Sequence, residues 1–195
     1  KLPLLVGGTG MYVNALMNGL AVIPPIPDEV RARVRGLVVR NNELHTILAA
    51  RDPLMGGRLK AGDTQRILRA LEVMEATGTS LAKWQEQTTA PQFPTAAYYC
   101  FAAMHPRAEI YARINARFET MMENGALDEV RALMALNLSP DIPILRAHGV
   151  PELMAYLRGE MTRADAIRKA QQNTRNYAKR QLTWFRNQCR DWARG

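Results

Sequence analysis

The chain has 195 residues, of which 47% are hydrophobic and 23% are charged, a composition typical of a soluble globular protein and not of a disordered one. No apolar run approaches the roughly 20 residues of a membrane-spanning helix, so we expect no transmembrane segment. The two cysteines, Cys100 and Cys189, show no CxxC spacing, which argues against structural zinc and favours reduced thiols in a cytoplasmic protein.

The net charge of +8 is concentrated near the C-terminus. Residues 163–195 hold nine Lys or Arg against two Asp, whereas the other 162 residues carry 17 basic and 16 acidic side chains. Residues 163–195 therefore carry a net charge of +7, out of +8 for the whole chain. A basic patch of this kind favours contact with a polyanion, with nucleic acid as the first candidate.

The N-terminal stretch predicts a short buried strand over Leu2–Val6, a glycine loop at Gly7–Gly10 and a helix that starts near Met11. Because a buried strand needs neighbours, usually from preceding βα units, we expect further N-terminal chain before Lys1. A loop of sequence GGTG before a helix can bind an anion through backbone N–H groups and the Thr9 hydroxyl. A tight turn is the alternative, since the lysine of a P-loop is missing.

The middle of the chain reads as a helical insertion. After the proline-rich hinge "AVIPPIPDEV", Asp28 is a plausible N-cap for a helix that ends near residue 41. Helices are also predicted at 43–50 and 64–77, the second of which ends at Gly78. The stretch "TTAPQFPT" is a linker, so we place the insertion at roughly 26–93.

The second half returns to a strand and then to helices. Residues 96–104 predict a second buried strand, broken at His105 and Pro106. The helices predicted after it cover 107–124, 127–136, 152–158 and, after Thr162 as N-cap, Arg163 to about Trp192. Two strands around a mostly helical stretch predict an α/β core with a helical insertion.

The last helix separates an apolar face from a cationic one. Residues 173–187, "NTRNYAKRQLTWFRN", contain four basic and three aromatic side chains and no carboxylate. At ~100° per residue one arc is apolar, and its edge carries a stripe of five cations about 33 Å long. These are Arg168, Arg175, Lys179, Arg186 and Arg190. A merely solvated helix would usually include Glu between such cations, so the pattern favours nucleic acid.

Four blocks of the sequence, taken in order, resemble the bacterial tRNA dimethylallyltransferase (isopentenyl-tRNA transferase) family: "LPLLVGGTGMYVNAL", "DTQRILRALEV", "RINARFETMMENGALDEVRAL" and "NTRNYAKRQLTWFR". The resemblance implies transfer of a dimethylallyl group from its diphosphate to N6 of the adenosine on the 3′ side of the anticodon. It also implies a P-loop nucleotide-kinase-like α/β core, residues 1–25 and 94–195, with an insertion, 26–93, that contacts the anticodon stem-loop.

The same resemblance assigns roles to residues. Thr9 and Arg117 look like contacts to the diphosphate, and Mg²⁺ is the implied cofactor. The positions that match tRNA contacts are Arg31, Gln65, Arg66, Ile67, Leu68, Arg69, Arg146, Gly149, Thr174, Arg175, Lys179, Arg180 and Gln181. We further expect a monomer in the cytoplasm without membrane contact.

The sequence departs from the family pattern in what it lacks. The family's P-loop and general-base aspartate lie N-terminal to the glycine-loop strand and have no counterpart here, so we expect this chain to bind RNA but to be catalytically incomplete alone. Val150 replaces a tyrosine found in many members. Two other readings stay open: a noncatalytic RNA-binding module, and an isopentenyltransferase for free adenine nucleotides, which would not need the basic helix.

Overall fold

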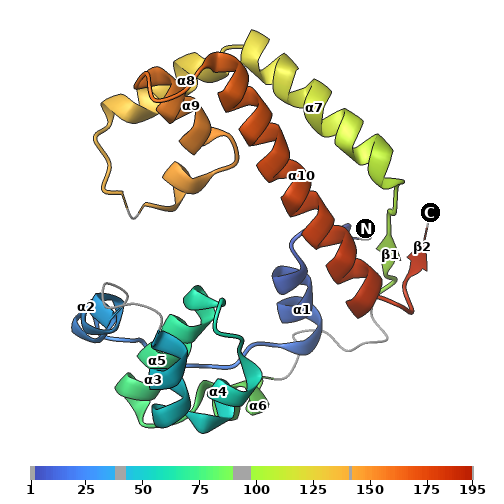
Figure 1. The fold of residues 1–195 in the computed structure, drawn as a ribbon. Coiled ribbons are helices and arrows are strands. Elements are labelled where there is room, and N and C mark those ends of the chain that lie inside the picture. The colour runs from blue at the N-terminus through green and yellow to red at the C-terminus, as the bar shows by residue number, and fades with distance from the viewer. Residues whose placement is uncertain (1–2, 38–42, 90–97, 141, 195) are drawn as a thin grey trace. The chain divides into compact units, whose positions relative to one another are not determined.

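A computed structural model of the chain describes residues 3–37, 43–89, 98–140 and 142–194. It divides into two compact units, coloured by residue number in Figure 1. The core unit comprises Lys1–Gly10 and Tyr98–Gly195, and the insertion unit comprises Met11–Ala97. The insertion unit thus begins at Met11, earlier than the boundary near residue 26 that the sequence suggests.

The insertion unit is helical. Its helices are α2 (Asp28–Gly36), α3 (Leu44–Arg51), α4 (Pro53–Arg58), α5 (Thr64–Thr77) and α6 (Leu81–Glu86), and α1 (Gly10–Asn18) begins at the last residue of the core unit's N-terminal segment. Helix α5 packs against both α2 and α3. It ends where predicted, because Gly78 takes the left-handed conformation (φ 66°) that stops a helix.

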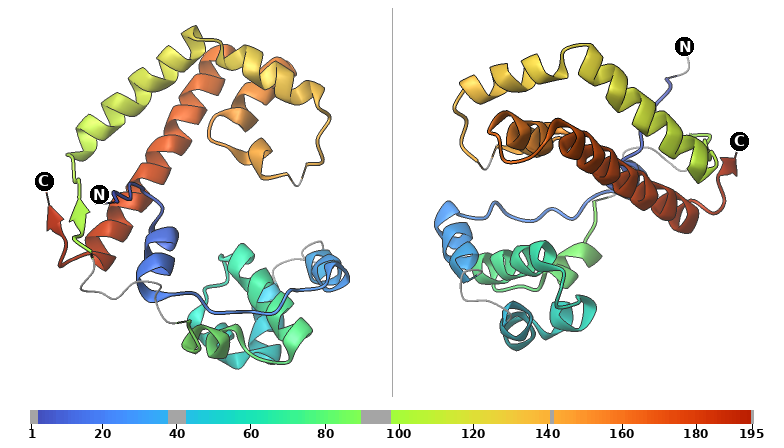
Figure 2. Two further views of the ribbon diagram at one scale, coloured as in Figure 1. Left: turned by 180° about the vertical axis from the view of Figure 1, so that it is seen from behind. Right: turned by 45° about the horizontal axis from the view of Figure 1, so that its top comes forward.

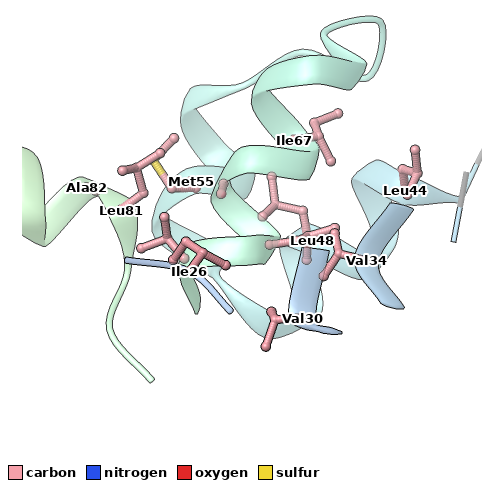
Figure 3. Close-up of a cluster of buried hydrophobic side chains, with 12 residues drawn as sticks. Ile26, Val30, Val34, Leu44, Leu48, Met55, Ile67, Leu81 and Ala82 are labelled. Carbon is pink, nitrogen blue, oxygen red and sulfur yellow. The ribbon is translucent and has the colours of Figure 1, made fainter. Parts of the chain in front are cut away.

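The core of the insertion unit is a cluster of aliphatic side chains from these helices, shown in Figure 3. Val34, Leu48 and Ile67 are fully buried in it. Gly56 allows α4 to approach α3 closely, since a Cβ there would lie 2.7 Å from the Cα of Ala49. Burial of the apolar faces of α2, α3 and α5 therefore holds this unit together.

Short helices and one cap differ from the predictions. The helices α4 and α6 were not predicted, and each begins after a side chain that accepts from a backbone N–H group: Asp52 from Met55 and Ser80 from Ala82, both at 3.1 Å. Six residues are too few to display a helical period. The assignment of Asp28 as an N-cap was wrong, since this residue is already the first of α2.

The core unit consists of α7 (Arg107–Glu123), α8 (Ala126–Ala135), the 3-10 turn η3 (Pro143–Arg146), α9 (Val150–Leu157), α10 (Arg163–Gln188) and the two-residue strands β1 (Phe101–Ala102) and β2 (Ala193–Arg194). The views in Figures 1 and 2 agree that α7 runs beside α10. Helices α8 and α9 lie near the beginning of α10, and the strands lie near its end.

The apolar centre of the core unit lies between α7, α8, α9 and the first half of α10. Phe118, Met122, Leu153 and Ala170 are among its buried residues. Helix α10 begins as predicted, because the Thr162 side chain accepts a hydrogen bond of 3.1 Å from the backbone N–H of Asp165. Among the described residues, no helix is both long and apolar enough to span a membrane.

The strand predictions were only partly right. Residues 3–9 form no strand, and Leu4, Leu5 and Val6 are 76–88% exposed, so the predicted buried strand is not formed over residues 3–6, and Leu2 lies outside the described residues. A strand needs a neighbour to pair its backbone, and no described residue supplies one there. Within 96–104 only Phe101–Ala102 forms a strand, parallel to β2, and residues 96–97 fall outside the described ranges.

Candidate nucleic-acid interface

The exposed side of α10 is polar, cationic and free of carboxylates over its C-terminal half. It contains an open depression of about 550 Å³ lined by Asn176, Lys179, Arg180, Thr183, Trp184, Asn187 and Gln188. Amide and hydroxyl groups there offer hydrogen bonds, while the cations supply positive potential. Such a surface suits a phosphodiester backbone.

Several cations on this side have no anionic partner in the part of the chain that the structure describes. Lys179, Arg180 and Arg186 are exposed and form no ion pair there. The Arg180 guanidinium lies 5.5 Å from the centre of the Tyr177 ring, which orients it without neutralising its charge. These three charges are therefore available to an external anion.

The predicted stripe of five cations is shorter in the structure. Because α10 ends at Gln188, Arg190 lies beyond the helix, which corrects the predicted end near residue 192. Arg168 pairs with Asp165. Arg175 is half-buried, and its guanidinium donates to Asn115 Oδ1 at 2.5 Å and to Gln172 Oε1 at 2.7 Å. Of the stripe, Lys179 and Arg186 lie on α10, are exposed and form no ion pair with any described residue.

The glycine loop lies against α10. The carbonyl of Gly8 accepts a hydrogen bond of 2.9 Å from the Gln181 side chain. A Cβ on Gly10 would lie 2.3 Å from a ring carbon of Trp184, so only glycine fits there. Thr9, between them, is half-buried, and no described residue hydrogen-bonds to its hydroxyl. The loop therefore leaves a hydroxyl available at the N-terminus of α1, where an anion is stabilised.

The second predicted diphosphate contact, Arg117, projects from α7. It is exposed and has no ion-pair partner among the described residues. Its neighbours Asn115 and Phe118 are fixed from within the core unit, the first by hydrogen bonds from α10 and the second by burial. No contact in the described part joins Arg117 to Thr9, but both segments contact α10.

Two predicted tRNA contacts on the η3–α9 segment differ in kind. Arg146, at the end of η3, is exposed. Gly149 is buried with φ 93°, and a Cβ there would lie 2.8 Å from the Phe118 ring. Gly149 therefore forms the turn that lets α9 approach α7, which corrects its assignment to the RNA surface. The hydroxyl of Thr174 already has a partner within α10, since it donates a hydrogen bond of 2.9 Å to the carbonyl of Ala170.

The "QRILR" segment of α5 divides between surface and core. Gln65 and Arg66 are exposed, whereas Ile67 is fully buried and Leu68 packs against the same cluster. Five consecutive helical residues span all sides of a helix, so they cannot all face one ligand. Ile67 is thus a core residue and not an RNA contact, and Leu68 is mainly one.

The cations predicted to contact RNA in the insertion unit are already paired. Arg31 lies 3.5 Å from Asp28, Arg66 lies 3.1 Å from Asp63, and Arg69 lies 3.6 Å from Glu72. The first two pairs are exposed and therefore weak, so their arginines can exchange partners with a phosphate.

The described residues offer no group of three His, Cys, Asp or Glu side chains that could hold a metal ion. We therefore assign no described residue to the Mg²⁺ that the resemblance implies, and no step is assigned to the ion.

Comparison with known proteins identifies the family. The family model described as IPP transferase matches residues 1–188. The chain belongs to this family. It is 54% identical over 197 residues to a tRNA dimethylallyltransferase of Azorhizobium caulinodans, covering 100% of this chain and 63% of the relative. A tRNA dimethylallyltransferase of Wolbachia from Brugia malayi is 43% identical, covering 96% and 63%. The chain thus spans less than two thirds of the curated relatives it matches.

Solved structures share the fold. The full-length tRNA isopentenylpyrophosphate transferase of Bacillus halodurans is 30% identical with a TM-score of 0.54, covering 96% of this chain and 57% of that one. A eukaryotic dimethylallyltransferase acting on tRNA reaches a TM-score of 0.69 at 21% identity, covering 92% and 46%. These likenesses confirm the predicted fold family.

Some residues that organise the site were not singled out from the sequence. Gln171, which donates to α7, lies outside the four blocks that carry the resemblance. Asn115 of α7 and Trp184, which packs against the glycine loop, lie inside two of those blocks but were given no role there. A signal was present for the glutamines, since at ~100° per residue Gln171 and Gln181 both fall within the apolar arc of α10. Polar groups on a buried face need internal partners.

Proposed function

We propose that the gene product containing this chain is a tRNA dimethylallyltransferase, and that this chain supplies its RNA-binding helix and two diphosphate contacts. One observation carries the proposal: α10 presents cations that form no ion pair with any described residue, and the same helix holds the GGTG loop through Gln181 and Trp184. A helix that serves a polyanion and an anion-binding loop at once fits an enzyme whose two substrates are RNA and a diphosphate.

The reaction breaks the bond between C1 of the dimethylallyl group and the diphosphate oxygen, and it forms a bond from C1 to N6 of adenosine. Diphosphate leaves, and N6 loses a proton to a base that we do not assign in this chain. Negative charge develops on the leaving group, so donors and cations placed there accelerate the reaction. The Thr9 hydroxyl, the N-terminus of α1 and Arg117 are our candidates for these contacts.

The RNA partner we propose is the anticodon stem-loop of tRNA. Lys179, Arg180 and Arg186 would contact phosphates, and Arg31 and Arg66 would do so after leaving their exposed carboxylate partners. The target adenosine must leave the loop stack to reach the diphosphate. A cytoplasmic monomer that uses Mg²⁺ is likewise an expectation supported by the family resemblance.

The test is an assay of the full-length gene product with total tRNA, dimethylallyl diphosphate and Mg²⁺, followed by mass spectrometry of the digested nucleosides. We expect a dimethylallyl mass on adenosine. The 195-residue chain, which lacks a GxxxxGK[ST] motif, is assayed in parallel and should bind tRNA without transfer.

A third reaction, with free AMP in place of tRNA, tests the alternative hypothesis of an isopentenyltransferase that acts on free adenine nucleotides. Product on AMP but not on tRNA would support that hypothesis and reject the tRNA dimethylallyltransferase. If both the full-length gene product and the 195-residue chain bind RNA but neither forms product, the remaining hypothesis is a noncatalytic RNA-binding module.

A further inference from the structure

Helix α10 holds the glycine loop on both sides of Thr9. On one side Gln181 donates to the Gly8 carbonyl at 2.9 Å, and a Cβ on Gly8 would lie 2.6 Å from the same amide nitrogen. On the other side the Trp184 ring leaves no room for a side chain at Gly10. These two α10 residues are three positions apart, so they lie on one side of the helix. The backbone that carries the Thr9 hydroxyl is therefore fixed at both ends.

The same helix holds α7 on both sides of Arg117. The buried Gln171 side chain donates to the Asn115 carbonyl at 3.2 Å and to the Glu119 carboxylate at 3.5 Å. Arg175 donates to the Asn115 side chain at 2.5 Å. Asn115 and Glu119 flank Arg117 on α7, so these bonds fix the helical turn from which that guanidinium projects.

We infer that Gln181 and Gln171 are positioning residues, which set Thr9 and Arg117 relative to one another for a single diphosphate. The inference rests on the proposed function, because that function supplies the diphosphate. It reassigns Gln181, which the sequence resemblance places among the tRNA contacts. The neighbouring Lys179 and Arg180 remain at the exposed surface. In this inference Lys179 and Arg180 contact RNA, whereas Gln181, next to them on α10, holds the glycine loop.

The physical reason is the steep dependence of such contacts on position. Ten residues of α-helix fix a separation of about 15 Å between the two glutamines, since the helix rises ~1.5 Å per residue. A misplacement of ~1 Å at a reacting group can cost about a hundredfold in rate. A glutamine amide that donates to a backbone carbonyl holds the loop without adding charge beside the diphosphate.

The test separates loop positioning from RNA binding in the full-length gene product. Gln181→Met keeps the side-chain volume but removes the N–H donor. We expect at least a tenfold loss in kcat/KM for dimethylallyl diphosphate, with the Kd for tRNA changed less than twofold. Gln181→Glu, whose carboxylate repels the Gly8 carbonyl, should lose more, and Gln171→Met should show the same pattern.

Two comparison variants complete the design. Lys179→Ala with Arg180→Ala should raise the Kd for tRNA about tenfold and leave the KM for dimethylallyl diphosphate unchanged. Gln85→Met, at an exposed position on α6, should change neither constant. Circular dichroism melting of each variant shows whether it is folded at the assay temperature.

A Gln181→Met protein with weakened tRNA binding and normal diphosphate kinetics would overturn the inference and restore Gln181 as an RNA contact. Titration calorimetry with inorganic diphosphate provides a readout without turnover. If the parent protein transfers nothing, the proposed function fails, and a tenfold weaker diphosphate Kd in Gln181→Met would still support the positioning role. An unchanged Kd, or no diphosphate binding by the parent, would overturn it.

Discussion

The two units use their positive charge differently. In the insertion unit most described arginines are paired with carboxylates: Arg31 with Asp28, Arg33 and Arg51 with Glu75, Arg35 and Arg69 with Glu72, Arg58 with Glu86, and Arg66 with Asp63. In the core unit, Lys179, Arg180 and Arg186 have no such partner among the described residues of α10.

The difference shows which charge is available to RNA. The insertion unit has 10 basic and 8 acidic residues, for a net +2, and the core unit has 16 and 10, for a net +6. Carboxylates beside an arginine lower the local potential even where the pair adds little stability. We therefore expect α10 to supply most of the electrostatic affinity, with the insertion unit adding shape and a few polar contacts.

The largest expected effect tests the core role of α5 in the insertion unit. Ile67→Ala should lower the free energy of unfolding by about 2–5 kcal/mol, because it leaves a cavity at a fully buried site. Gln65→Ala, on the exposed side of the same helix, should change it by less than about 0.5 kcal/mol. Urea denaturation followed by circular dichroism measures both. Unchanged stability with weakened tRNA binding in Ile67→Ala would restore it as an RNA contact.

The next prediction tests the unpaired cations directly. Combined replacement of Lys179, Arg180 and Arg186 by alanine should weaken tRNA binding about a hundredfold in low salt. The slope of log K against log salt concentration should also fall by about 2, since ~0.7–0.9 counterions are released per phosphate contact. Fluorescence anisotropy with labelled tRNA at 50 to 200 mM salt, values chosen from the usual range of such titrations, gives both quantities.

The matched control removes the same charge from the insertion unit. Arg33, Arg51 and Arg58 are exposed, as the α10 cations are, but they are paired with Glu75 and Glu86. Their combined replacement by alanine should weaken binding less than threefold and leave the salt slope nearly unchanged. Equal losses in the two triple variants would mean that only total charge matters, and the contrast between the units would fail.

Removing a buried carboxylate tests from the other direction whether ion pairing keeps the arginines of the insertion unit from contributing to tRNA binding. Glu72 is 8% exposed and lies 4.0 Å from Arg35 and 3.6 Å from Arg69. Glu72→Gln leaves both arginines without their anion, and we expect a loss of about 1–3 kcal/mol in the free energy of unfolding. The freed charge should tighten tRNA binding two- to threefold at low salt. Weaker binding by a folded Glu72→Gln protein would contradict this.

Long helices were predictable from the sequence because their signals are local. The apolar period and Gly78 defined α5, and Thr162 defined the start of α10. The strand expected at Leu2–Val6 could not be judged locally, because pairing depends on neighbours elsewhere in the chain. The candidate-site residues follow the same rule: Thr9 and the cations could be proposed from local sequence, whereas the hydrogen bond of Gln181 depends on its partner, Gly8, which lies 173 positions away.

The smallest expected effect concerns a buried thiol, Cys189, near the C-terminal end of the core unit. Both cysteines are free, and burial raises the pKa of the Cys189 thiol, with nearby Cys100 adding to the rise and Arg194 opposing it. The unfolded chain therefore loses this proton at lower pH than the folded chain does. The contribution of Cys189 to stability is intact below the ordinary thiol pKa of about 8.5 and declines as pH rises through the raised folded value.

Urea denaturation between about pH 8 and pH 10, a window around the ordinary thiol pKa, should show this decline as a fall in the free energy of unfolding with rising pH. Cys189→Ala provides the reference, because tyrosines and lysines that titrate in the same range are present in both proteins. The difference in slope between the two proteins isolates the thiol. Identical slopes would mean that Cys189 titrates alike in the folded and unfolded chains, and that the segment before β2 admits water freely despite the burial of its side chain.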